Sequence, residues 1–92
     1  MDRTELEREL TEAFEGDDAT LRVVSRQARD LADSGKYEAD QGADLTVDVV
    51  VSNLSDAPDD APLAERWNWW IGSLDIAHGG YEPFRVQPWA LE

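Results

Sequence analysis

The sequence predicts a single small α+β domain, in which a mostly antiparallel sheet of two or three strands packs against three helices. Three observations lead to this fold class. Apolar and polar residues alternate along residues 44–54, as they do in a half-buried strand. Three other segments repeat apolar residues at helical spacing. A chain of 92 residues has material for one core, so we assign residues 1–90 to one domain.

The first element is expected to be a helix. Thr4, followed three residues later by Glu7, has the spacing of a capping box and predicts the start of the helix. Leu6 and Leu10 recur at helical spacing behind it, and Gly16 predicts its end. The apolar stripe is narrow, so we expect this helix to pack on the rest of the domain from outside.

A second helix is expected to follow directly. Asp17 or Asp18 is placed to cap it, and Gly35 is placed to end it after about Ser34. Its buried face is predicted from four residues at helical spacing: Leu21, Val24, Ala28 and Leu31.

The sheet is expected in the next part of the chain and at its end. The alternation along residues 44–54 places Leu45, Val47, Val49 and Val51 on one face, which favours an antiparallel strand with one wet side. Residues 36–40 are a candidate partner strand, joined to it by residues 41–43. Residues 81–89 form a third extended segment, bracketed by Pro83 and Pro88 as in an edge strand. The resulting order is helix, helix, strand or hairpin, helix, strand.

The third helix carries two apolar faces. It is expected to be capped by Asp59 or Asp60 and to end at about His78, before two glycines. One arc forms a predicted core face: Leu63, Trp67, Trp70, Ile71 and Leu74. At about 100° per residue, Trp69 and Ile76 fall on the opposite side of the helix.

Three explanations of this second face stay open, and Arg66 and Ser73 flank Trp69 in each of them. The first helix, or the tail around Trp89, can cover Trp69. A second copy or another protein can bind there, since Trp and Arg are enriched at interface hot spots. An apolar or aromatic small molecule is the third possible occupant.

The composition is strongly acidic. Asp and Glu number 21 against 8 Lys and Arg, the net charge is −13, and Lys36 is the one lysine. Such a charge favours solubility but strains the folded state through self-repulsion, which concentrated salt screens. The composition resembles that of cytoplasmic proteins of haloarchaea, an adaptation class rather than a functional family. We therefore expect a halophilic, cytoplasmic protein.

Composition also argues against several classes of function. The chain lacks the basic footprint that nucleic-acid binding needs, and no apolar run approaches the ~20 residues of a membrane span. It contains no cysteine, and the periodic apolar pattern argues against an acidic disordered chain. The start has no signal-peptide layout, and Leu91-Glu92 has the form of a purification-tag remnant.

Residues with catalytic or ligand chemistry are few. His78 is the one histidine, so a multi-histidine metal site is ruled out, and its place in a last helical turn suits a capping role. No catalytic constellation, metal site or cofactor motif is apparent. Arg22, Arg26 and Arg29 form the one basic cluster; it is either a set of surface ion pairs with Asp18, Asp30 and Asp33, or an anion site.

Two functions are therefore carried forward. The first is a non-enzymatic module that associates with itself or another protein through Arg66, Trp69, Ser73 and Ile76. The alternative is a module that binds a small molecule or an anion, either as a binding protein or as an enzyme. It would use the arginine face or a cleft near Asp48 and Asp75.

Overall fold

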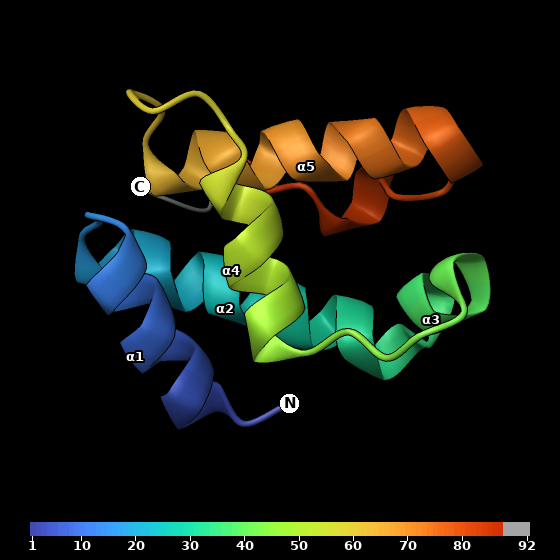
Figure 1. Ribbon diagram of the computed structural model, residues 1–92, viewed down its shortest axis with the longest axis horizontal. Coiled ribbons are helices and arrows are strands. Elements are labelled where there is room, and N and C mark those ends of the chain that lie inside the picture. Colours follow the sequence, from blue (N-terminus) through green and yellow to red (C-terminus); the bar gives the residue numbers. More distant parts are fainter. Residues whose placement is uncertain (88–92) are drawn as a thin grey trace.

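The computed structural model describes residues 1–87 and shows a helical domain (Figure 1). Within these residues the elements are α1 (Arg3–Ala13), α2 (Asp18–Ser34), α3 (Lys36–Gln41), α4 (Val47–Ser55), α5 (Leu63–His78) and a 3₁₀ turn, η1 (Glu82–Phe84). No strand is present in this part of the chain. The predicted α+β class, with its antiparallel sheet, is therefore wrong.

α1 is capped two residues earlier than the sequence pattern suggests. The Asp2 carboxylate, not the Thr4 side chain, accepts hydrogen bonds from the amides of Thr4 (2.9 Å) and Glu5 (3.5 Å). Asp and Thr compete for the same role at a helix start, and here the aspartate takes it. The helix ends at Ala13, three residues before Gly16.

α2 matches its prediction closely. Asp17 caps it by accepting a 2.7 Å hydrogen bond from the Thr20 amide, which lowers the pKa of the Asp17 carboxyl. Gly35 ends it with φ of 74°, a left-handed conformation that suits glycine. The predicted inner face is buried, namely Leu21, Val24, Ala28 and Leu31.

α4 replaces the strand predicted at residues 44–54. The Thr46 hydroxyl accepts a 3.2 Å hydrogen bond from the Val49 amide and so caps the helix. The buried residues are Val47, Val50 and Leu54, which follow a helical period. β-branched residues cost a helix only about half a kcal/mol each, and burial of this face against two other helices outweighs that preference. Val50, predicted on the wet face, is fully buried.

The other two predicted strands are also wrong. Residues 36–41 form the short helix α3, in which Lys36 and Asp40, four positions apart, pair at 3.2 Å. Residues 82–84 form η1, and the chain after it has no strand partner within the described residues. Trp89 and the Leu91-Glu92 pair, on which further expectations depended, lie outside the described residues.

α2 is the element around which the domain is assembled. It contacts α1, α3, α5 and η1, while α4 contacts α1 and α5. In Figure 1, α2 and α5 run along the long direction of the molecule and α4 crosses them. The largest fully buried side chains come from four helices and the segment after α5: Trp67, Tyr81, Leu6, Leu10, Leu31 and Leu54. None of the helices among residues 1–87 has the length and apolarity of a membrane span.

Candidate functional site

α5 carries most of the residues singled out from the sequence. It begins at Leu63 after Pro62, which offers no side-chain cap, and ends at His78 as predicted. Its N-terminal region is tied to the preceding loop by Arg66. The Arg66 guanidinium donates to the backbone carbonyls of Ala61 (2.9 Å), Leu54 (3.0 Å) and Asp59 (2.8 Å). Arg66 therefore organises the α4–α5 connection, and its donors face the chain's own backbone.

Two side chains of α5 hold the segment that follows it. The Trp67 indole N–H donates to the Phe84 carbonyl at 2.8 Å. The Asn68 amide donates to the Val86 carbonyl at 3.0 Å, and its oxygen accepts from the Val86 amide at 2.8 Å. All three partners on the segment are backbone groups, so these contacts place few demands on its sequence.

Trp70 completes the inner side of the helix. Its ring meets the Trp67 ring edge-on, with centroids 5.5 Å apart, and meets Tyr37 of α3 at 5.9 Å. Aromatic pairs prefer this edge-to-face geometry. Trp67 is fully buried and Trp70 almost so, which confirms the predicted core role of both residues.

Trp69 points the other way. Its side chain is 43% exposed, and Ile76, two helical turns further on, is 91% exposed. Between them lies the exposed Ser73, whose hydroxyl donates to the Trp69 carbonyl at 3.0 Å. We call Trp69, Ser73 and Ile76 the α5 stripe. Within residues 1–87 this second apolar face stays exposed, so α1 does not cover it; the tail around Trp89 lies outside the described residues.

A comparison with protein-family models bears on a tetrapeptide of α5, residues 67–70. The model of the WNWW domain matches residues 1–75, which include α1 to α4 and most of α5. The letters of its description are those of Trp67-Asn68-Trp69-Trp70. The chain belongs to the WNWW domain family. No curated protein and no solved structure matches it.

The geometry divides the four residues of this WNWW domain's tetrapeptide into two groups. Trp67 and Trp70 fill the core, and Asn68 fixes the following segment, so all three have partners within the domain. Trp69 makes no side-chain hydrogen bond or aromatic pair among the described residues and lies on the surface. Contacts within residues 1–87 account for Trp67, Asn68 and Trp70 but not for Trp69.

The three arginines predicted as a cluster do lie together in this WNWW domain. Arg22, Arg26 and Arg29 of α2 line a groove of about 640 Å³, and Arg3 of α1 joins them. The sequence analysis missed Arg3, because only the packing of α1 on α2 brings it there. The expected ion pairs of α2, each four residues apart, are not formed.

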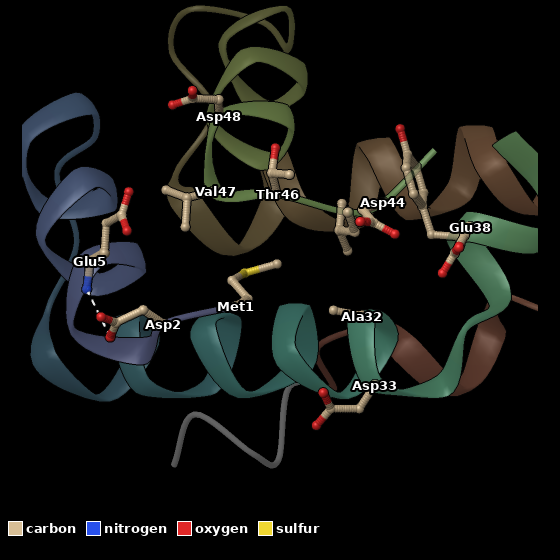
Figure 2. Close-up of a pocket in the computed structure, with 12 residues that line it drawn as sticks. Met1, Asp2, Glu5, Ala32, Asp33, Glu38, Asp44, Thr46, Val47 and Asp48 are labelled. Carbon is tan, nitrogen blue, oxygen red and sulfur yellow. Dashed lines mark hydrogen bonds between the residues drawn. The ribbon is translucent and has the colours of Figure 1, made fainter. Parts of the chain in front are cut away.

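Asp48 and Asp75, proposed above to flank one cleft, lie at different places. Asp48 lines a pocket of about 430 Å³ that holds six carboxylates (Figure 2), those of Asp2, Glu5, Asp33, Glu38, Asp44 and Asp48. Asp75 lies near the end of α5, where its carboxylate accepts a 3.0 Å hydrogen bond from the Tyr81 amide. Asp75 is not among the residues that line the pocket of Asp48. No group of His, Asp and Glu side chains within residues 1–87 is arranged to hold a metal ion.

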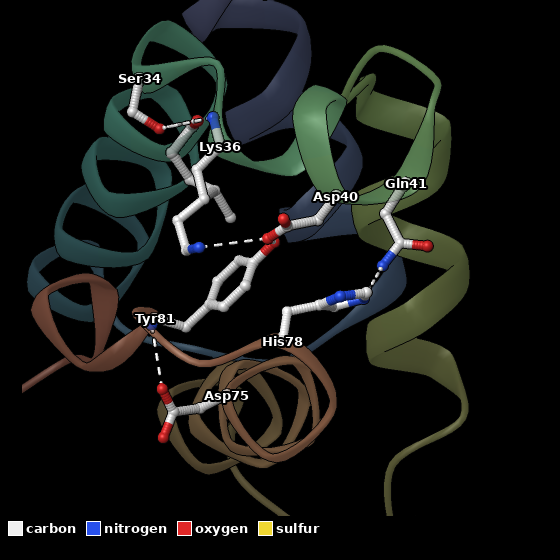
Figure 3. Close-up of polar contacts among 8 residues, drawn as sticks. Ser34, Lys36, Asp40, Gln41, Asp75, His78 and Tyr81 are labelled. Carbon is white, nitrogen blue, oxygen red and sulfur yellow. Dashed lines mark hydrogen bonds and ion pairs between the residues drawn. The ribbon is translucent and has the colours of Figure 1, made fainter.

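The one lysine and the one histidine of this WNWW domain meet in a polar network beside Tyr81 (Figure 3). The Tyr81 hydroxyl donates to the Asp40 carboxylate at 2.8 Å, and the Lys36 ammonium donates to the same oxygen at 3.2 Å. The hydrogen bond from Tyr81 and then the Lys36 ammonium lower the pKa of Asp40. Burial, and then the nearby Asp40 carboxylate, raise the pKa of Tyr81 well above its usual value.

This network fastens α3 to the end of α5. The Gln41 amide donates to the His78 imidazole at 2.9 Å, and the Lys36 ammonium lies 4.7 Å from the centre of the Tyr81 ring. His78 thus contacts α3 in addition to its place in the last turn of α5. This network was not predicted from the sequence, because residues 36–40 were expected to form a strand. The four-residue spacing of Lys36 and Asp40 was the one signal in the sequence that could have indicated it.

Proposed function

We propose that this WNWW domain is a non-enzymatic association module whose contact surface is the α5 stripe, and that its first partner is a second copy of the same chain. The observation that supports this is Trp69, whose side chain makes no hydrogen bond or aromatic pair within residues 1–87 and is 43% exposed beside an almost fully exposed Ile76. We further propose that the protein works in the salt-rich cytosol of a halophile.

The stripe differs in composition from the other exposed helix faces. Exposed positions of α2 are mostly charged, as at Asp18, Arg22 and Asp30, and α4 exposes Asp48 with two serines. Between Arg66 and His78, by contrast, α5 exposes Trp69, Ser73, Ile76 and Ala77, none of them charged. Large apolar side chains that gather on one face of a small acidic domain favour burial against a partner.

A second copy of the chain can bind the α5 stripe through a two-fold symmetric interface. Trp69 and Ile76 stand about 10 Å apart along the helix, with the small Ser73 between them. When two such helices pack antiparallel across a two-fold axis, Trp69 meets Ile76 of the partner subunit on both sides of the axis. The stripe is therefore complementary to itself, which is the requirement of a two-fold interface.

The net charge of the chain also favours the α5 stripe as the contact surface, and it makes the association depend on salt concentration. Each chain carries a net charge of −13, so two copies repel one another over about a Debye length in dilute buffer. An uncharged stripe is where two copies approach at least electrostatic cost. Molar salt shortens the screening length to about 3 Å and strengthens apolar association.

The decisive experiment is the molar mass in about 2 M KCl, a salt level that screens surface charge, by light scattering and sedimentation over a range of concentrations. We expect a concentration-dependent dimer. Ile76→Glu places a carboxylate against the apolar ring of Trp69 of the partner subunit and is expected to give a monomer. Trp69→Gln is expected to weaken the dimer as well, while circular dichroism shows an unchanged helix content.

The matched control is Ser52→Glu, which adds the same charge at an exposed position of α4 away from the stripe. It is expected to leave the dimer intact. A wild-type chain that stays monomeric up to millimolar concentration contradicts self-association. Equal loss of the dimer in both Glu variants would show that total charge, rather than the stripe, controls it.

A further inference from the structure

Four of the chain's seven arginines line one groove between α1 and α2. Arg22, Arg26 and Arg29 project from successive turns of α2, and Arg3 comes from the first turn of α1. Arg22 and Arg26 are exposed and Arg29 is half-buried. The groove measures about 640 Å³, within the usual size range of small-molecule sites.

The remaining three arginines all have partners. Arg8 pairs with Glu9 at 3.8 Å, Arg85 pairs with Glu82 at 2.8 Å, and Arg66 donates to three backbone carbonyls. Within residues 1–87, the four groove arginines make no ion pair and donate no side-chain hydrogen bond. The division follows location, since each arginine outside the groove is engaged and each one inside it is not.

The groove gathers four arginines that form no ion pair within residues 1–87, beside three acidic residues, in a strongly acidic chain. Acidic side chains outnumber basic ones 21 to 8, and Asp18, Asp30 and Asp33 stand four residues from Arg22, Arg26 and Arg29. Pairing at that spacing needs only a change of rotamer. The four guanidiniums outnumber the three carboxylates that line the same groove, and a bound anion offsets the remaining positive charge.

We propose that the groove binds a nucleoside polyphosphate, with its phosphates on the arginines. Guanidinium groups form paired hydrogen bonds with phosphate oxygens, and their flat faces stack on aromatic bases. Arg22 and Arg29 stand about 10 Å apart along α2, so the arginines suit several linked anionic groups better than one isolated ion.

The acidic side chains of the groove further restrict the class of ligand that it can bind. Glu7, Asp30 and Asp33 line it together with the arginines. Carboxylates repel a bare inorganic anion but accept hydrogen bonds from ribose hydroxyls and base amino groups. A long nucleic acid fits poorly, because beyond the groove it would meet a surface dominated by acidic residues. The mixed lining therefore favours a compact ligand that carries both phosphates and hydrogen-bond donors.

The test is calorimetric titration of the full chain with magnesium-free ATP at about 0.2 M and 2 M KCl, two ionic strengths that differ strongly in screening. We expect saturable 1:1 binding that weakens as the salt concentration rises. Amide chemical-shift changes are expected at the residues around Arg22, Arg26 and Arg29. Arg26→Gln, at the centre of the groove, is expected to weaken binding by roughly 10-fold or more, the effect of a lost charged hydrogen bond.

Arg8→Gln is the matched control, because it removes the same charge from an exposed arginine outside the groove. It is expected to change the affinity less than about 2-fold, as a surface charge outside the groove does. Inorganic triphosphate and adenosine are each expected to bind more weakly than ATP. Equal losses in the two variants, shift changes away from α2, or no saturation at millimolar ATP would overturn the site. Triphosphate binding as tight as that of ATP would overturn the nucleoside part of the proposal.

Discussion

Asn68 and Val86 form a complete backbone-style pair through a single side chain. The Asn68 amide donates to the Val86 carbonyl at 3.0 Å, and its oxygen accepts from the Val86 amide at 2.8 Å. A neighbouring strand would make these two bonds in a sheet. Here both bonds come from the side-chain amide of Asn68 on α5, so the segment after η1 is held in place without a sheet.

Loss of the Asn68 amide is expected to destabilise the domain. Asn68→Ala leaves both polar groups of the nearly buried Val86 backbone unpaired, and the expected cost is about 1–3 kcal/mol of unfolding free energy. Urea unfolding followed by circular dichroism measures it. Asn68→Asp keeps the acceptor for the Val86 amide but sets a carboxylate against the Val86 carbonyl, so it is expected to be destabilising too. An Asn68→Ala variant as stable as the wild type would show that water replaces both bonds.

Trp67 and Trp69 should respond very differently to the same substitution. Trp67→Phe removes volume from the core and leaves the Phe84 carbonyl without its donor, for an expected loss of about 2–3 kcal/mol. Trp69→Phe, on the surface, is expected to change monomer stability by less than about 0.5 kcal/mol. Thermal unfolding at low protein concentration, where association does not contribute, makes the comparison. Similar losses at both positions would contradict the division of the tetrapeptide into core and surface residues.

Ionisation of Tyr81 is expected to destabilise the folded domain at alkaline pH. Its pKa is raised in the folded state, so the stability that its neutral hydroxyl contributes is complete below the ordinary tyrosine pKa of about 10 and is lost as pH rises above that value. Tyr81→Phe is expected to cost about 1 kcal/mol at neutral pH, since it removes one buried hydrogen bond, and to make stability less sensitive to pH above 10.

The same variant tests the Asp40 carboxyl. The Tyr81 hydroxyl is the main cause of the lowered Asp40 pKa, so this pKa is expected to rise towards its ordinary value in Tyr81→Phe. A carboxyl whose folded pKa is lowered stabilises the fold above its unfolded pKa, and this contribution disappears as pH falls through the folded pKa. Carbon-detected NMR titration of Asp40 in both proteins follows the change. An Asp40 pKa that is the same in both would mean that the charges of Lys36 and His78, rather than the Tyr81 hydroxyl, lower it.

Salt should stabilise the domain. With a net charge of −13 and three ion pairs among residues 1–87, repulsion between carboxylates outweighs attraction in dilute buffer. We expect the midpoint of thermal unfolding to rise steadily from dilute buffer to molar KCl. The Arg8→Gln variant, which is more acidic by one charge, is expected to show a steeper rise. A midpoint that does not depend on salt would contradict the halophilic interpretation.

The sequence alone predicted those helices whose signals are local. A cap at Asp17 or Asp18, the Gly35 stop and the inner face of α2 were predicted from neighbouring residues, and the end of α5 at His78 was predicted from two glycines. Periodicity also placed Trp69 and Ile76 on the side of α5 opposite the core face, whereas their exposure was shown only by the structure. These features depend on propensity and helical spacing, which the chain carries at every position.

α4 shows why the fold class was mispredicted. Its run of valines fits a period of two and a period of 3.6 equally well, and intrinsic preference favours a strand. Which period holds depends on what the segment packs against. Here Val47, Val50 and Leu54 are buried, and α4 contacts α1 and α5.

What the sequence by itself determined is therefore the acidic composition, the limits of α2, and the two opposite apolar faces of α5. Tertiary structure decided the helical state of α4, the use of Asn68 in place of a strand, and the meeting of Arg3 with the arginines of α2. The reason is physical. Local preferences amount to fractions of a kcal/mol per residue, whereas burial of a large apolar side chain is worth about 1.5–3 kcal/mol, so packing decides wherever the two disagree.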